Sequence, residues 1–185
     1  MKILASLGLA LCLVACSNGD DLALSSKAPS TQTAPKSGEF AFTPKEFVEA
    51  FNTAARNYGK PFYMNSAEIR HGLVHDYFQQ VFDSGISITA SVSKDTGYIT
   101  TITALVKGDG GKDNREIVFS LSKLVTAATN PSMSREKISD MVNAMLQESS
   151  PTADAKMFPQ RFMNHVRYAL RNDSGVGYWW IANPV

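Results

Sequence analysis

Strict alternation over residues 86–93 is the feature that most limits what this chain can fold into. The segment reads ISITASVS, so the apolar side chains of Ile86, Ile88, Ala90 and Val92 share one face of an extended strand. Small hydroxyl side chains fill the other face. A hydrophobic period of two is typical of a half-buried β-strand, which packs one face on a core and turns the other to water. The segment therefore predicts a sheet that is covered on one side.

Turn signals on both sides of this strand identify its neighbours in the sheet. The sequence DSG at 83–85 separates it from the aromatic-rich segment 75–82, and KDTG at 94–97 separates it from 98–106. Connections this short join antiparallel neighbours, because a parallel pair needs a long crossover. Residues 62–69 (FYMNSAEI) are expected to add a further edge strand.

Three amphipathic segments predict helices. The first begins at a capping box, with Thr43 as N-cap and Glu46 three residues later, and Gly59 ends it. The second starts at Asp113 and the third at Ser134. Each carries an apolar stripe at helical spacing, which marks the side that packs on the core.

Two further strands are expected near 161–170 and 178–182, joined by the turn NDSG at 172–175. The order along the chain is then helix, three or four strands, two helices and two strands. Helices with one apolar side and strands with one buried face fit an α+β fold. We expect a two-layer domain in which helices pack on one face of a mainly antiparallel sheet.

The uncovered face of this sheet is the candidate binding surface. Parity within 161–170 gives a core side of Phe162, Val166, Tyr168 and Leu170, and an outward side of Met163, His165 and Arg167. One of Trp179 and Trp180 must also face outward unless that strand is covered on both sides. Because Tyr, Trp and Arg are enriched at binding hot spots, the candidate surface residues are His165, Arg167, Trp179 and Tyr77. The alternative is that Tyr and Trp side chains close the end of the core.

The N-terminal leader indicates where the chain works. Lys2 supplies a positive charge, and residues 3–15 carry none. This apolar run is too short to cross a bilayer, which takes about 20 residues. A charged start, a short apolar stretch and small residues at its end are typical of a secretory signal peptide. The sequence LVAC at 13–16 resembles the lipobox of bacterial lipoproteins.

This resemblance implies cleavage before Cys16, a diacylglyceryl thioether on its sulfur and usually acylation of the new amino terminus. Ser17 follows, and not the aspartate associated with inner-membrane retention. The family pattern therefore favours the outer membrane of a Gram-negative cell, with the domain facing the periplasm. Two or more acyl chains anchor a protein stably, whereas one holds it only marginally. The membrane is thus one expected partner.

The expected organisation is a signal peptide at 1–15, the lipidated Cys16 with a flexible tether up to residue 39, and one globular domain at 40–185. The tether is rich in Ser, Thr, Ala, Pro and Gly, and its reach is about 25–30 Å. Cys12 leaves with the leader, so the mature chain can form no internal disulfide. Cleavage removes one of the 18 basic residues and none of the 17 acidic ones, which makes the mature chain formally neutral. No nucleic-acid partner is expected without a clustered basic excess.

The sequence holds no clear catalytic or metal motif. His71 and His75 lie four residues apart, and His165 could approach them in the fold, where three histidines could hold zinc. However, HExxH is missing, and the stretch around His71 reads as turn and strand. The sequence GDGGKDN at 108–114 lacks the spacing of an EF-hand and the GK[ST] of a phosphate loop. We therefore expect no cofactor, no metal and no catalytic residue.

Two classes of function remain open. The first is a protein-binding envelope lipoprotein with a periplasmic partner, either an accessory factor of an envelope or secretion machine or an immunity-type inhibitor. The second is a cell-envelope enzyme or small-ligand receptor, whose pocket would join His75, His165 and an acidic residue.

Overall fold

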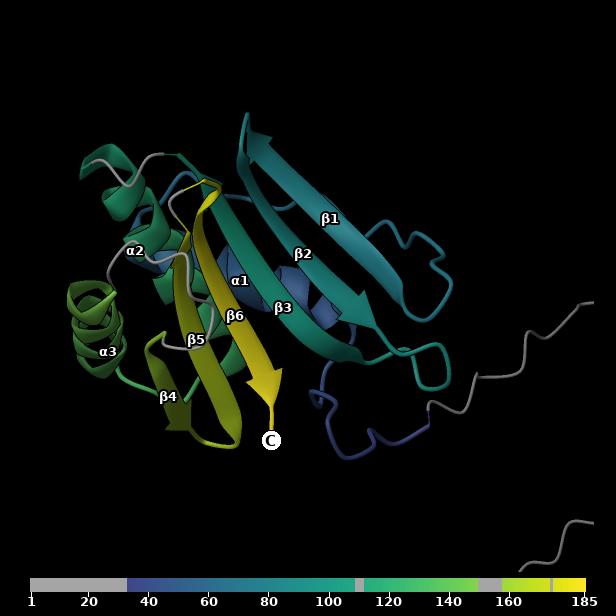
Figure 1. Ribbon diagram of the computed structural model, residues 1–185. Coiled ribbons are helices and arrows are strands. Elements are labelled where there is room, and N and C mark those ends of the chain that lie inside the picture. The colour runs from purple at the N-terminus through teal and green to yellow at the C-terminus, as the bar shows by residue number, and fades with distance from the viewer. Residues whose placement is uncertain (1–32, 109–111, 150–157, 174) are drawn as a thin grey trace, which may run out of the picture. The chain divides into compact units, whose positions relative to one another are not determined.

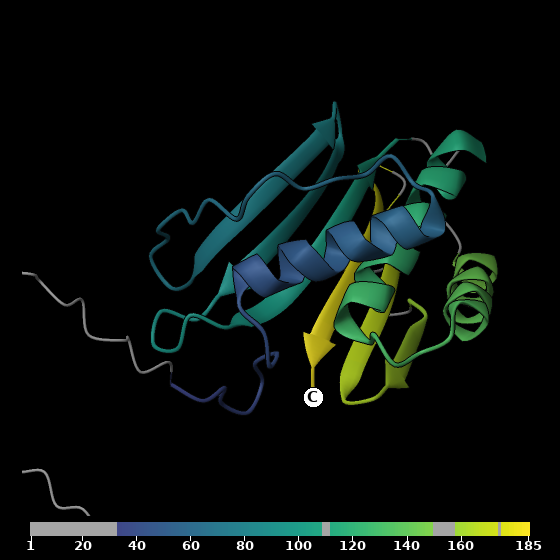
Figure 2. The ribbon, with the colours of Figure 1, turned by 180° about the vertical axis from the view of Figure 1, so that it is seen from behind.

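The computed structural model describes residues 33–108, 112–149, 158–173 and 175–185. The elements are α1 (Pro44–Tyr58), β1 (Asp76–Asp83), β2 (Ile86–Val92), β3 (Ile99–Lys107), α2 (Lys112–Thr129), α3 (Arg135–Glu148), β4 (Gln160–Met163), β5 (Val166–Asp173) and β6 (Gly177–Pro184). The six strands form one antiparallel sheet, and the helices lie on one side of it (Figures 1 and 2). The predicted α+β class is therefore confirmed.

The strand order is β1-β2-β3-β6-β5-β4, so the sheet consists of two three-stranded meanders joined at its centre. The first meander runs β1, β2, β3. The chain then leaves the sheet through α2 and α3, enters the far edge at β4 and returns through β5 to β6 (Figure 1). Pairing of β3 with β6 joins the two halves, and α2 covers these two central strands on the helix side.

The first helix forms as its capping signals predict. The Glu46 backbone N–H donates to Thr43 Oγ1 at 3.4 Å, and the Thr43 N–H donates to the Glu46 carboxylate at 2.7 Å. Gly59 ends the helix at φ +60°, in the left-handed region that favours glycine. Phe47 is fully buried, with its ring centroid 6.2 Å from that of Phe78 on β1. The apolar stripe of α1 thus packs on the first meander.

The expected edge strand at 62–69 is not formed. The segment makes no ladder, and the nearest pairing is an isolated bridge between Arg70 and Tyr77. Its polar backbone groups bond to side chains instead. The Asn52 amide donates to the Met64 carbonyl and accepts from the Met64 N–H, each at 2.8 Å. Because a side chain of α1 satisfies this backbone, the segment follows the helix rather than the sheet.

The expected strand at 161–170 is a hairpin of β4 and β5. Asn164 and His165 form a two-residue turn with φ of +46° and +64°. Two positive φ values match a type I′ turn, the geometry that best continues the twist of paired strands. The sequence signal was easy to miss, because histidine stands where glycine usually follows asparagine.

This turn changes which side chains of β4 face the core. Phe162 pairs with Arg167 and Met163 pairs with Val166, and directly paired residues share a face. Phe162 is therefore outward and 65% exposed, whereas Met163 packs against the core. Both assignments from the sequence were wrong. Beyond the turn the predicted parity holds, because Val166, Tyr168 and Leu170 are buried and Arg167 is exposed.

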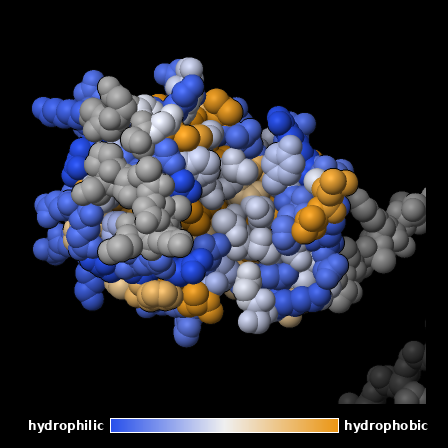
Figure 3. All heavy atoms as spheres, viewed as in Figure 1, coloured by the Kyte–Doolittle hydropathy of each residue, from blue (hydrophilic) through white to orange (hydrophobic). Residues whose placement is uncertain are grey.

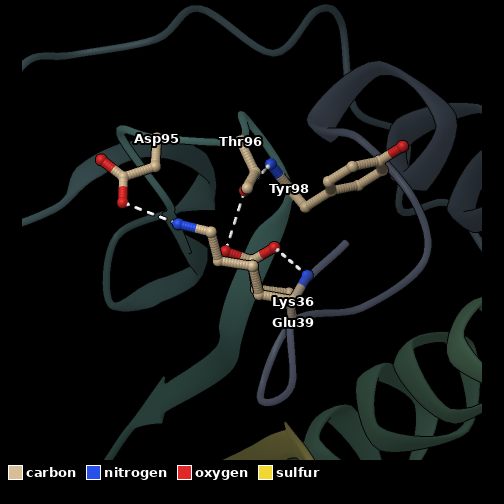
Figure 4. Close-up of polar contacts among 5 residues, drawn as sticks. All are labelled: Lys36, Glu39, Asp95, Thr96 and Tyr98. Carbon is tan, nitrogen blue, oxygen red and sulfur yellow. Dashed lines mark hydrogen bonds and ion pairs between the residues drawn. The ribbon is translucent and has the colours of Figure 1, made fainter. Parts of the chain in front are cut away.

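Contacts of the folded domain extend into the segment predicted to be tether. The Lys36 ammonium lies 2.9 Å from Asp95 Oδ2, and the Thr96 hydroxyl donates to Glu39 Oε1 at 2.8 Å (Figure 4). Phe40 is buried against the core. Residues 36–40 are therefore fixed to the hairpin between β2 and β3, which the sequence signalled only as a turn.

A buried polar cluster joins the helix layer to the sheet. The Tyr168 hydroxyl lies 2.6 Å from Thr129 Oγ1 and accepts from the Asn130 amide. Burial raises the pKa of Tyr168 to about 12, although both of these hydrogen bonds act to lower it. The neutral phenol is therefore favoured in the folded state.

We expect this tyrosine to make the protein sensitive to alkali. The folded-state pKa of Tyr168 exceeds the ordinary value of 10. The stability that the neutral phenol contributes is therefore fully present below pH 10 and is lost as the pH rises to about 12. The two-unit difference corresponds to roughly 2–3 kcal/mol of unfolding free energy. Urea titrations at stepped pH should show this decline in the wild type and in Tyr63→Phe, and a weaker decline in Tyr168→Phe. Identical pH profiles for all three proteins would contradict it.

Candidate functional site

The side of the sheet away from the helices carries its own set of side chains, and we call it the outer face. Strand register places the following residues on it: Tyr77, Gln79, Val81, Ser87, Thr89, Ser91, Thr101, Thr103, Leu105, Trp179, Ile181, Asn183, Arg167, Ala169, Arg171, Gln160 and Phe162. None of the three described helices lies over this face (Figure 1). Hydrophobic side chains gather there in small groups among polar ones (Figure 3).

A row of paired residues gives the outer face its strongest apolar feature. Leu105 on β3 pairs with Trp179 on β6, and Trp179 pairs with Arg171 on β5. The Trp179 side chain is therefore flanked by an aliphatic residue on one side and a guanidinium on the other. Arg171 Nη2 donates to Asp173 Oδ2 at 2.7 Å, which holds the guanidinium in place. Tryptophan and arginine are both enriched among the few residues that contribute most of the binding energy at protein interfaces.

Two rows of paired residues away from Trp179, the outer face is polar, and its side chains are hydrogen-bonded to one another. Arg167 Nη2 donates to Asn183 Oδ1 at 3.3 Å, and the Asn183 amide donates to Thr101 Oγ1 at 2.8 Å. These bonds cross β5, β6 and β3, so they link the exposed Arg167 to the two central strands of the sheet. Between these hydrogen-bonded residues and Trp179 lies a row of small or aliphatic side chains, in which Thr103 pairs with Ile181.

The structure brings three of the four predicted surface residues to the outer face. Arg167 and Trp179 lie on adjacent strands, β5 and β6. Tyr77 is on β1, four strands from β5, which at about 4.8 Å a strand is roughly 19 Å away. His165 is instead in the β4–β5 turn, where its carbonyl accepts from the Val185 N–H at 2.8 Å. Arg167 and Trp179 thus form a compact pair, while Tyr77 belongs to the far edge.

The three histidines do not gather. His71 belongs to the loop before β1, with Nδ1 3.0 Å from Asp76 Oδ2, and His165 belongs to the turn at the opposite edge strand. Across the described parts of the chain, no group of three or more His, Cys, Asp or Glu side chains is placed to hold a metal ion. Cys16 and the glycines at 110–111 lie outside the described residues.

Sequence reasoning missed a groove on the helix side of the sheet. It measures about 720 Å³ and lies between α1, residues 65–69 and the adjoining ends of β1 and β2, and we call it the α1 groove. Its apolar lining comprises Pro44, Val48, Ala67, Ile69 and Val92. Figure 2 shows the first turn of α1 near the end of β2, and residues of both segments line the groove.

Four charged residues line the α1 groove, and one of them is mostly buried. Lys45 and Glu49 are largely exposed, with Lys45 Nζ 3.9 Å from Glu49 Oε1, and the side chain of Lys94 is 43% exposed. Asp76 is only 15% exposed, with Oδ1 3.7 Å from Lys94 Nζ. Burial acts to raise the pKa of Asp76, but the His71 hydrogen bond, the charges of His71 and Lys94 and the Gly72 backbone N–H outweigh it, so the pKa lies below the ordinary value. The groove therefore contains a fixed carboxylate.

One signal for this groove was present in the sequence. Asp76 stands two residues before the buried Phe78, so a strand beginning at Asp76 puts a carboxylate on the core side of the sheet. The sequence could not indicate that residues 65–69 lie outside the sheet and form the opposite wall of the groove.

Comparison with known proteins assigned no relationship: no protein-family profile, curated protein or solved structure matches the chain. In the part of the chain that the structure describes, no helix has the length and apolar composition needed to span a bilayer.

Proposed function

We propose that this protein is a lipid-anchored envelope lipoprotein whose domain binds a periplasmic protein through its outer face. The row of Leu105, Trp179 and Arg171 is the observation that carries the binding part of the proposal. Arg167 extends the same surface with an oriented charge. Aromatic and arginine side chains held in fixed positions lose little conformational freedom when a partner binds, which favours affinity.

The anchoring part of the proposal rests on the lipobox resemblance at 13–16 and the charge-free segment before it. Cleavage before Cys16 would leave residues 17–35 between the lipid and Lys36, which contacts Asp95 of the β2–β3 hairpin. A protein of this kind serves as an accessory factor of an envelope machine or as an inhibitor that captures a toxic enzyme. Both roles need a protein-binding surface and no catalytic group.

Affinity capture from detergent-solubilised envelopes tests the binding surface. We expect specific partners of the wild-type chain to be lost, or reduced at least tenfold, in Trp179→Ala and Arg167→Ala, because both remove hot-spot side chains from one surface. Arg56→Ala is the matched control, since Arg56 is exposed on α1, on the other side of the sheet. Retention of every captured protein by all three variants would contradict the proposal.

A further inference from the structure

The α1 groove has the size and lining of a small-molecule site. Ligand sites usually enclose about 300–1,000 Å³, and they combine apolar walls with a few polar groups that fix orientation. The α1 groove, at about 720 Å³, lies within this range. Its apolar residues come from α1, residues 67–69 and β2, so an aliphatic or aromatic chain would contact three separate segments at once.

One buried carboxylate oxygen of the groove is placed to receive a cationic ligand. The four charges of the groove cancel in two pairs, Lys45 with Glu49 and Lys94 with Asp76, so the preference rests on the geometry of Asp76 and not on net charge. The Asp76 carboxylate is held by His71 through Oδ2, whereas Oδ1 is buried and makes no hydrogen bond among the described residues. Lys94 Nζ, at 3.7 Å, is too far to donate to it. A buried carboxylate oxygen without a donor is an unusual feature, because such atoms are nearly always hydrogen-bonded.

We propose that the α1 groove binds a small molecule that carries a protonated amine on an apolar chain, with Asp76 as the counter-ion of the amine. The ammonium donates to the unbonded carboxylate oxygen and displaces the flexible Lys94 side chain. The apolar chain lies against Val48, Ile69 and Val92. This site is separate from the outer face, since α1 lies on the other side of the sheet (Figure 2).

Photoaffinity labelling of the full-length chain tests the proposal. Three probes share one diazirine-bearing alkyl chain and end in an amine, an alcohol or a carboxylate. Mass spectrometry follows labelling of residues 43–52 and 65–69 against probe concentration. We expect the amine to reach half-saturation at a concentration about tenfold below that of the alcohol, because a charge-assisted hydrogen bond is stronger than a neutral one.

Two substitutions with opposite expected signs separate a binding role from a structural one. Asp76→Asn should bring the half-saturation concentrations of amine and alcohol together, whereas Lys94→Gln should lower that of the amine further by removing its competitor. Asp140→Asn, the same chemical change on the exposed side of α3, should change neither. A general loss of folding cannot produce this pattern, because Lys94→Gln leaves Asp76 and its His71 bond in place.

Three results would overturn the proposal. The first is that the carboxylate probe labels the groove more strongly than the amine probe and that Lys94→Gln abolishes this labelling, which would identify an anion site. The second is an amine preference that survives Asp76→Asn. The third is the absence of label from both groove segments. None of these results bears on capture of a protein by Trp179 and Arg167, so the two proposals fail independently.

Discussion

Replacing Trp180 with alanine is expected to lower the free energy of unfolding by about 3–5 kcal/mol, whereas the same change at Trp179 should cost about 1 kcal/mol or less. The two residues are adjacent in sequence and lose the same atoms. Their difference lies in the face of β6 that each occupies. Urea denaturation followed by circular dichroism measures both values.

The size of the Trp180 effect follows from its surroundings. Its side chain is fully buried on the helix side of β6, and its ring stacks on Tyr168 with centroids 5.6 Å apart. Leu170 and Ala104 flank it on the neighbouring strands. Truncation would therefore leave a large cavity at the centre of the sheet, and the cost of a cavity adds to the lost burial of the indole. Trp179 is only partly buried, so its truncation leaves no enclosed void.

Binding and stability should separate between the two variants. Trp179→Ala is expected to remain folded and to lose partner capture, while Trp180→Ala loses stability first. Equal destabilisation by both substitutions would mean that the outer face is covered as thoroughly as the core. It would also remove Trp179 from the proposed interface.

Replacing Cys16 with serine should abolish lipid attachment altogether. A serine hydroxyl cannot take the place of the thiol as acceptor of the diacylglyceryl group, and the precursor should remain largely uncleaved. Metabolic labelling with radioactive palmitate measures attachment, and gel mobility reports cleavage. Cys12→Ser is the matched control, because Cys12 would leave with the signal peptide and the change should have no effect. Palmitate incorporation into the Cys16→Ser protein would refute the anchoring proposal.

Local patterns were sufficient for most of the fold. The alternation at 86–93 and the capping box at Thr43 predicted β2 and α1, because period and cap geometry depend on neighbouring residues alone. The same parity predicted that one residue of the Trp179–Trp180 pair faces outward unless the strand is covered on both sides. It could not say which pair of strands would lie at the centre of the sheet, since the β3–β6 pairing joins residues 70 to 80 positions apart.

Most of the errors arise where contacts between distant segments override a short-range signal. Residues 62–69 have strand-like composition, yet Asn52 of α1 captures the backbone at Met64. The turn at Asn164 and His165 is a local exception, because asparagine is common at a left-handed position but histidine stands where glycine is expected. The α1 groove could not be predicted, because its walls come from distant segments, namely α1, residues 65–69 and β2.

The central position of β6 bears on when the domain can fold. Of the six strands β6 is synthesised last, yet it separates β3 from β5 in the finished sheet. Until β6 is in place, β3 and β5 each have one edge without a hydrogen-bonded partner, and no strand pairing joins the two halves of the sheet. Under the proposed export, this arrangement helps to keep the chain unfolded for translocation, because the sheet cannot be completed before the final segment is synthesised.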